Sequence, residues 1–227
     1  MLGTIVNVSC ILTGSVIGSF VSRGIKEKYK TALFDGLGLA TVGLGANAFV
    51  SNIPKVTYPV LFIASIAIGT ILGTRLDLDG KFHGLLEKAK GGSKLAEGLS
   101  TAILLFCIGT LGPIESRLNG NNTYLFTNAT LDFVSSIILS SAYGIGIALA
   151  ALVLFCWQGS IYLFAGFIAP YMTPALMGEI SVLGGIFLMS SGLGILQIRD
   201  CKTLNMLPAL LVPPAFYALV NVIKSLL

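Results

Sequence analysis

Charge is scarce in this chain. Only 11% of its 227 residues are charged, less than half of the roughly 25% found in a typical soluble domain. His83 is its single histidine, and its four cysteines form no CxxC motif and no Cys/His cluster. These shortages exclude a zinc site of the usual spacing and argue against structural disulfides. We therefore expect neither a bound metal nor a cofactor.

Sequence signatures of catalysis are missing as well. The chain contains no P-loop, GxSxG or HExxH motif, and no Ser/His or paired-Asp constellation lies within an apolar segment. We therefore expect no enzyme activity. The net charge of +4 comes from basic residues that flank apolar segments and do not form a separate basic patch. This distribution follows the positive-inside rule of membrane proteins and argues against a nucleic-acid partner.

What the chain does have is long stretches without charge. Hydrophobic residues make up 55% of the chain, and its mean hydropathy is +0.90. Six of seven charge-free stretches run 17 to 22 residues, close to the ~20 that carry an α-helix across a bilayer. The seventh runs 46 residues, enough for two spans, which we expect to break near 157–160. The stretches are Met1–Ser22, Gly36–Pro54, Val56–Thr74, Gly98–Ile114, Phe133–Gly178, Ile180–Ile198 and Thr203–Ile223.

This pattern predicts an all-α fold, a polytopic transmembrane helical bundle of about eight spans. Residues 1–227 would form a single integral membrane domain. We expect Met1–Ser22 to be a retained first span, because it lacks the basic region that begins a cleavable signal. Within the loop 77–97, Phe82, Leu85 and Leu86 stand at helical spacing between charges, which predicts a short interfacial helix.

The distribution of Lys and Arg predicts the orientation. With the N-terminus outside the cell, loops on the inner side hold 11 basic residues and those on the outer side hold 3. Both termini are then expected outside. An alternative has seven spans: Ile161–Met177 would be re-entrant because of Pro170 and Pro174, and the C-terminus would lie inside.

Two glycine pairs indicate close helix packing. Gly14/Gly18 and Gly69/Gly73 are GxxxG motifs, in which the absence of side chains lets helix backbones approach each other. Their surroundings are similar, and Asp35-Gly36 resembles Glu97-Gly98. We therefore predict that the first helix pair is repeated as the second, with the glycine pairs at equivalent contacts.

The second span is rich in glycine. It contains Gly36, Gly38, Gly43 and Gly45. Such a segment either packs closely against its neighbours or unwinds locally, so that its carbonyl groups line a cavity. We favour packing.

Four carboxylates stand near the predicted span ends. We expect Asp35 and Glu97 to cap the N-termini of their helices. Asp132 would begin an inward-running helix, and Glu179 would lie at the outer face. Within the spans the polar side chains are otherwise amides and hydroxyls. The candidate solute- or ion-binding residues are Asn7, Asn47, Asp132, Gln158 and Asn205; alternatively, each amide only bonds one helix to another.

Several short motifs resemble a known family. They occur along most of the chain and in the expected order, and are similar to the bacterial membrane family catalogued as domain of unknown function 554. The resemblance implies a multi-pass protein of the bacterial cytoplasmic membrane, in a family sometimes labelled as candidate transport proteins. It implies no active site. The motifs are Met1–Asn7 with Gly14 and Gly18, Asp35–Ala40, Leu131-Asp132, Trp157-Gln158-Gly159 and Asn205–Ala209.

Two functions are compatible with these residues. The first is a transporter or channel for a small polar solute or a cation, since amides and carboxylates suit a cation better than an anion. The second is a non-transporting scaffold or regulatory partner that binds another membrane protein through its glycine faces. In either case we expect a bilayer-embedded protein that forms homo-oligomers.

Overall fold

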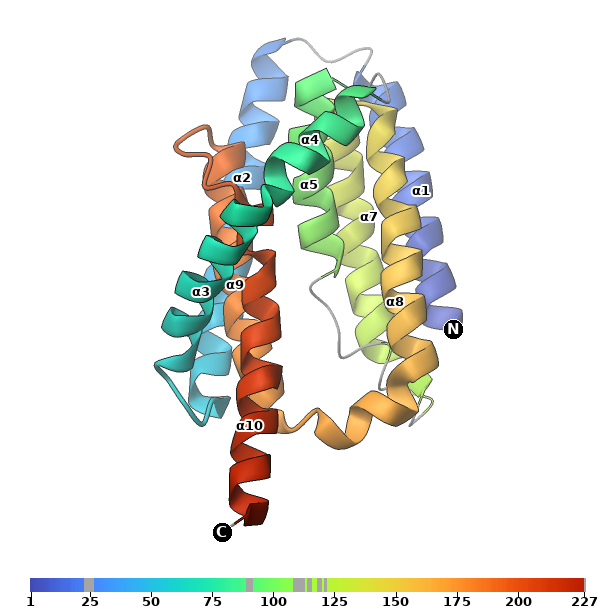
Figure 1. The fold of residues 1–227 in the computed structure, drawn as a ribbon. Helices are drawn as coiled ribbons and strands as arrows, with labels where there is room; N and C mark the ends of the chain where they lie inside the picture. The colour runs from blue at the N-terminus through green and yellow to red at the C-terminus, as the bar shows by residue number, and fades with distance from the viewer. Residues whose placement is uncertain are drawn as a thin grey trace. The chain divides into compact units, whose positions relative to one another are not determined.

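The computed structural model is helical (Figure 1), and its described residues contain no strand. It describes residues 1–22, 27–88, 92–107, 113, 116–117, 120 and 122–226. The basic residues Arg23, Lys26 and Lys90 of the predicted inner loops lie outside the described residues. The elements are α1 (Leu2–Ser22), α2 (Glu27–Asn52), η1 (Ile53–Lys55), α3 (Leu61–Leu76), α4 (Leu78–Lys88), α5 (Gly92–Cys107), α7 (Thr123–Tyr143), η2 (Ile145–Ala148), α8 (Leu149–Ile168), η3 (Ala169–Tyr171), α9 (Pro174–Ile195), η4 (Thr203–Leu211) and α10 (Val212–Leu226).

Length and composition identify the membrane spans. In the described part of the chain six helical segments are long and apolar enough to cross a bilayer, and a seventh results if the bent pair α3–α4 is one span. Helix α5 has 16 residues, and its part from Gly98 to Cys107 is free of charge. The predicted all-α membrane fold is confirmed, and the count agrees roughly with eight. The six segments are Leu2–Val21, Thr31–Lys55, Thr123–Tyr143, Ile145–Phe167, Pro174–Ile195 and Thr203–Ile223.

The boundaries of the fifth and sixth predicted spans were wrong. The break expected near 157–160 lies within continuous helix α8. The chain instead breaks at Gly144, which has φ 89° and separates α7 from η2, a conformation that glycine adopts without steric cost. Residues 161–177 are the end of α8, the short η3 and the start of α9, so they form no separate re-entrant span.

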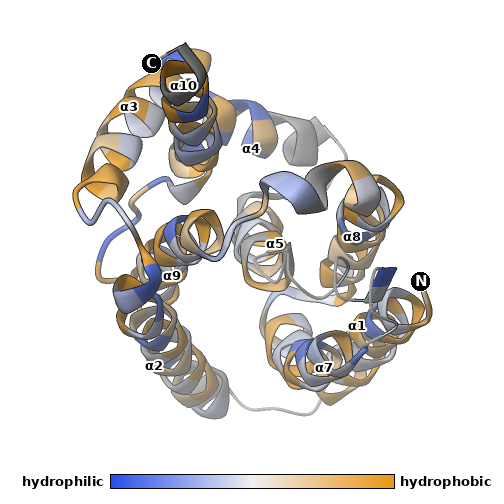
Figure 2. Cartoon of the chain, turned by 90° about the horizontal axis from the view of Figure 1, so that it is seen from below, coloured by the Kyte–Doolittle hydropathy of each residue, from blue (hydrophilic) through white to orange (hydrophobic). Residues whose placement is uncertain are grey.

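Two compact units make up the chain: Met1–Leu37 with His83–Tyr171, and Gly38–Phe82 with Met172–Leu227. We call them unit 1 and unit 2. In unit 1, α1 packs against both α7 and α8, and α5 packs against the same two helices. Figure 2 shows α5, α8, α1 and α7 following one another around a ring. Helices α7 and α8 therefore occupy opposite corners of a four-helix arrangement.

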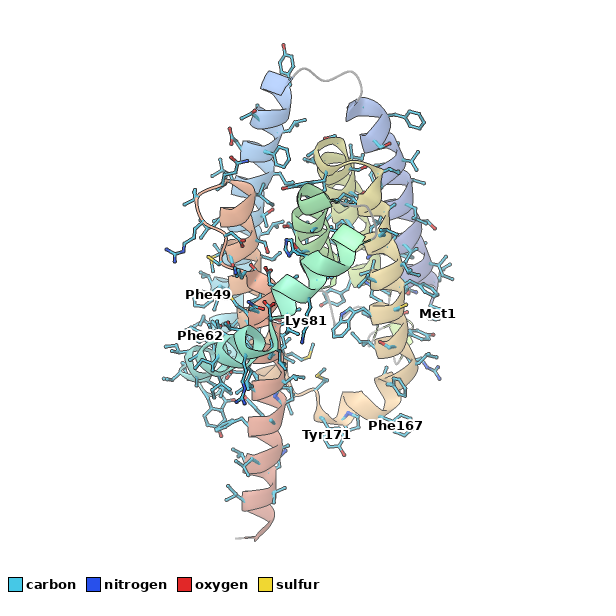
Figure 3. The ribbon with its side chains drawn as sticks, turned by 45° about the horizontal axis from the view of Figure 1, so that its top comes forward. Met1, Phe49, Phe62, Lys81, Phe167 and Tyr171 are labelled. Carbon is cyan, nitrogen blue, oxygen red and sulfur yellow. The ribbon has the colours of Figure 1, made fainter. Side chains whose placement is uncertain are left out.

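Unit 2 is built around α9. Its hydrophobic core contains Leu183 and Phe187 of α9 and Ala209 of η4. Helix α3 packs along η4. The rings of Phe49 and Phe62 meet edge-to-face between α2 and α3, with their centroids 5.5 Å apart (Figure 3).

Both GxxxG motifs are packing faces. A Cβ at Gly14 would overlap Ser136 of α7, and one at Gly18 would overlap the Ile137 carbonyl. The corresponding atoms at Gly69 and Gly73 would overlap the backbone of η4 at Ala209 and Asn205.

The predicted equivalence of these contacts was wrong. Helices α1 and α7 run parallel, because Gly14 lies beside Ser136 and Gly18 beside Ile137. In contrast, α3 and η4 run antiparallel, because the contacts of Gly69 and Gly73 descend from 209 to 205.

The glycine-rich second span is a continuous helix, α2. Gly38 packs beside Leu196, and Gly45 beside Met189 and Gly185 of α9. The packing interpretation is therefore confirmed for Gly38 and Gly45, whereas a Cβ at Gly36 or Gly43 would meet no described atom within 4 Å. The unwound alternative is wrong, because α2 is continuous.

The expected caps are not caps. Asp35 is the ninth residue of α2, and Glu97 is the sixth of α5. The short helix predicted in the loop 77–97 is present as α4, Leu78–Lys88, and its position at the membrane interface stays a prediction.

Candidate functional site

Asp132 lies in the middle of a membrane span and not at its end. Helix α7 begins at Thr123, well before the helix start predicted at Asp132, so that Asp132 is the tenth of its 21 residues. The side chain is 5% exposed and belongs to a buried stripe at spacings of four and three: Leu125, Ala129, Asp132, Ser136 and Leu139. This spacing places Asp132 on the face of α7 that packs inside unit 1. A carboxylate at this depth is costly and usually has a function.

Asn7 lies beside Asp132. Its side chain is a polar neighbour of the Asp132 carboxyl group, but the two groups do not form a hydrogen bond. Asn7 is fully buried, and neither its amide nitrogen nor its oxygen has a hydrogen-bond partner among the described residues. One turn earlier on the same face of α1, Thr4 is also fully buried, and its hydroxyl is likewise unpaired in the described structure.

Gln158 lies at about the same depth as Asp132, on the helix that is diagonally opposite in unit 1. It is the tenth residue of α8, which has 20 residues, just as Asp132 is the tenth of α7. Both helices are about 30 Å long at 1.5 Å per residue, so each residue lies near mid-depth. Gln158 is 1% exposed, and both polar atoms of its amide are buried without a partner in the described part of the chain.

These residues belong to the interior of unit 1. Asp132 and Gln158 come from the two diagonal helices, and Asn7 from α1, which contacts both. Each is buried and so faces inward. Neighbouring helix axes are typically 8–10 Å apart, which makes the diagonal of such a bundle about 11–14 Å. We call Thr4, Asn7, Asp132 and Gln158 the unit 1 polar residues. Together they present one carboxylate, two amides and one hydroxyl, all ligands suited to a cation.

The other two predicted site residues belong to unit 2 and make local hydrogen bonds. Asn47 is exposed on α2, and its Oδ1 accepts a hydrogen bond from Ser51 at 3.3 Å. Asn205 is buried in η4, and its Oδ1 accepts from the backbone N–H of Asp79 at 2.9 Å. Because Asp79 is in the first turn of α4, Asn205 satisfies a free donor at that helix end. The structure thus gives Asn205 a stabilising role.

Sequence reasoning underestimated Glu179. It is the sixth residue of α9, and its side chain is fully buried. Its Oε1 accepts a hydrogen bond from the backbone N–H of Tyr58 at 3.3 Å, while Oε2 has no partner among the residues that the structure describes. Its position right after Gly178, in a stretch otherwise free of charge, was the available signal. Thr4 was also missed, although it shares the buried face of Asn7.

The N-terminal end of α1 meets the start of α7. Gly3 lies against Leu125 and Asn122. Partial burial and the nearby Arg117 guanidinium lower the pKa of the Met1 amino group below its usual value. Arg117 also lies over the ring of Tyr162, 5.7 Å from its centroid, near the end of α8. Phe167 in the last turn of α8 and Tyr171 in η3 project outward (Figure 3), with exposures of 79% and 74%. Aromatic side chains so placed are typical of a membrane–water interface.

Comparisons with known proteins agree with this picture. The chain is 52% identical over 217 residues to the uncharacterized membrane protein YdfK of Bacillus subtilis (strain 168), with 94% of each chain covered. It is 26% identical over 226 residues to the uncharacterized protein YqgA of Escherichia coli (strain K12), covering 93% of this chain and 94% of the other. No solved structure matches the chain. The family model described as protein of unknown function (DUF554) matches residues 2–218, and the chain therefore belongs to that family of membrane proteins.

Proposed function

We propose that the protein is a transporter or channel for a small monovalent cation or polar solute, and that unit 1 binds this substrate at Asp132, Asn7 and Gln158. The observation that carries the proposal is the buried Asp132 at the middle of α7, beside the unpaired amide of Asn7. Polar groups without partners inside a span are destabilising unless something binds them. A substrate would supply the missing partners.

The charge of the site favours a monovalent cation. The unit 1 polar residues contain a single carboxylate, and amide and hydroxyl oxygens complete the set. A bound monovalent cation would neutralise Asp132, whereas a divalent cation would leave an excess positive charge in a low-dielectric interior. An anion would be repelled by the Asp132 carboxylate. The unit 1 polar residues also include no Arg or Lys, which anion sites usually recruit. No catalytic step forms part of the proposal.

Flux into liposomes tests the proposal. Purified protein should pass sodium, potassium or a small polar solute into liposomes down an imposed gradient. Asp132→Asn should reduce that flux at least about tenfold, because it removes a charge-assisted contact worth roughly 1.5–3 kcal/mol. Gln158→Met, which keeps the volume and removes the amide, should reduce it in the same direction.

Asp200→Asn is the matched control. Asp200 is an exposed loop carboxylate that accepts a hydrogen bond from the Lys202 backbone N–H at 2.8 Å, so its neutralisation should leave flux unchanged. Gel filtration must show that all variants are folded. If Asp132→Asn transports like the unaltered protein, or if the liposomes are as tight as protein-free ones to every such solute, the proposal fails.

The scaffold alternative has less support. It assigns the glycine faces to a partner protein, but Gly14 and Gly18 already pack on α7, and Gly69 and Gly73 on η4. The expected homo-oligomer stays a prediction from the sequence.

A further inference from the structure

Unit 2 contains a second buried carboxylate, with aromatic surroundings. Glu179 is 0% exposed, and one of its oxygens is unpaired in the described structure. It is bound to the backbone N–H of Tyr58, in the segment that leads into α3. Lys55 lies close by, against Gly178, but its ammonium group donates to Asn52 Oδ1 at 3.0 Å. Among the described residues no ion pair joins Lys55 to Glu179.

Three aromatic rings gather beside this carboxylate. The ring of Tyr58 lies 5.0 Å from that of Phe216 and 5.7 Å from that of Tyr217, and the latter two are 6.3 Å apart, measured between centroids. The three interplanar angles are 80°, 77° and 75°. The three rings are therefore nearly perpendicular to one another. Such edge-to-face contacts pack the rings together, and the electron-rich ring faces can attract a cation placed over them.

The hydroxyl group of Tyr217 is the second polar feature. It is buried and unpaired within the described part of the chain. It lies near Thr57 and within electrostatic range of Glu179. An unpaired carboxylate oxygen and an unpaired phenol hydroxyl thus lie in one neighbourhood. The phenol carries its own proton, whereas the buried carboxylate oxygen needs a donor or a cation.

We infer that Glu179, Tyr58, Phe216 and Tyr217 form a binding site in unit 2 for a small organic ammonium cation. The carboxylate supplies the opposite charge, and the ring faces supply cation–π attraction, which strengthens as the site is desolvated. A bare metal ion fits less well, because the neighbourhood offers few oxygen ligands and mostly carbon. The site is separate from the unit 1 polar residues and does not depend on the function proposed for them.

Equilibrium binding of radiolabelled tetramethylammonium tests this inference. The probe should bind saturably to the full-length protein in lipid nanodiscs, and potassium at equal concentration should not displace it. Glu179→Gln should weaken binding at least about tenfold, through loss of a charge-assisted contact. Tyr58→Leu should also weaken it, although this variant keeps both the carboxylate and the backbone N–H that holds it. Asp200→Asn, which neutralises an exposed loop carboxylate outside both proposed sites, should bind the probe normally.

Three outcomes would overturn the inference. The first is the absence of saturable binding to the unaltered protein. The second is full displacement by potassium, which would indicate a site for inorganic cations. The third is unchanged binding by a folded Tyr58→Leu variant, which would show that the rings take no part. Because Tyr58→Leu retains Glu179, this comparison decides the question even if Glu179→Gln fails to fold.

Discussion

At the scale of single residues, the helix face on which a polar side chain lies decides what the side chain does. Ser140 donates a hydrogen bond from α7 to the Ser15 carbonyl of α1 at 2.6 Å, in a buried environment. Thr130, on the same helix, donates only to Phe126 of its own helix, at 3.1 Å and in an exposed position. The two hydroxyls are chemically similar, but only the first joins two helices.

Ser140→Ala should therefore destabilise unit 1 measurably. Loss of this interhelical bond should lower the free energy of unfolding by about 1 kcal/mol, a typical value for a buried hydrogen bond. Thr130→Ala is the control and should change it by less than about half as much, because its bond stays within one helix. Unfolding in mixed detergent and dodecyl sulfate micelles measures both. Equal effects of the two substitutions would contradict the assignment.

At the scale of elements, the glycines distinguish a packed helix face from an open one. Gly18 lies against the Ile137 carbonyl of α7, whereas Gly43 has open space where its Cβ would be. Asn205 similarly ties η4 to the start of α4 through the Asp79 amide. Each of these contacts joins segments distant in the sequence, so each fixes the register of two elements.

Gly18→Ala should destabilise the protein, and Gly43→Ala should not. The added methyl group at position 18 must push α1 away from α7, with a cost of about 1–3 kcal/mol, as for other overpacked contacts. The same change at position 43 should be neutral or stabilise by up to about 1 kcal/mol, because alanine favours helix more than glycine does. Thermal unfolding in detergent compares the two. A stable Gly18→Ala protein would mean that the α1–α7 contact is looser than described.

Asn205→Ala should loosen the first turn of α4. Without the side-chain acceptor, the Asp79 amide loses its partner, and helix-end stability should fall by about 1 kcal/mol, as when other caps are removed. Hydrogen exchange followed by mass spectrometry should then show faster exchange in a peptide that covers the start of α4. Asn47→Ala, which removes an exposed amide, should leave that peptide unchanged. Slow exchange in both variants would show that another group holds the α4 end.

At the scale of the molecule, helix directions within each unit agree with strict alternation across a membrane. The first and fifth apolar segments, α1 and α7, run parallel, as two odd-numbered spans must. The third and eighth, α3 and η4, run antiparallel. So do the second and seventh: Gly45 of α2 lies beside Gly185 of α9, and Gly38 lies beside Gly192. The expected orientation, with the N-terminus outside, stays a prediction from the 11 to 3 distribution of basic residues.

Cysteine labelling tests this orientation. With Cys10, Cys107 and Cys156 replaced by serine, the remaining Cys201 lies in the loop between α9 and η4. A membrane-impermeant maleimide should label it only after the cell membrane is permeabilised. Tyr171→Cys in a Cys-free background is the control: this position is exposed beyond α8 and should be labelled in intact cells. The opposite pattern would invert the orientation, and labelling of both positions from one side would contradict the alternation.

The sequence by itself determined the membrane fold, because hydropathy is a local property. A run of about 20 apolar residues must be helical in lipid, where no water can satisfy the backbone. The same locality explains why Gly14/Gly18, Gly69/Gly73 and the helix α4 were identified correctly: each signal lies within one or two turns. The family resemblance, carried by short motifs, was confirmed for the same reason.

Only the tertiary structure decided where α7 begins and which carboxylates are buried. Thr123–Asp132 reads as a polar loop by composition, yet it is helical, because Leu125 and Ala129 bury one face against α1 and its neighbours. The polar side chains of this stretch then lie largely on the other side, and Asp132 falls into the bundle interior. Whether a face is buried depends on helices 100 or more residues away, which no local count of charge can report. Because of this long-range packing, Asp132 is the central residue of the candidate site, although it was predicted to begin a helix.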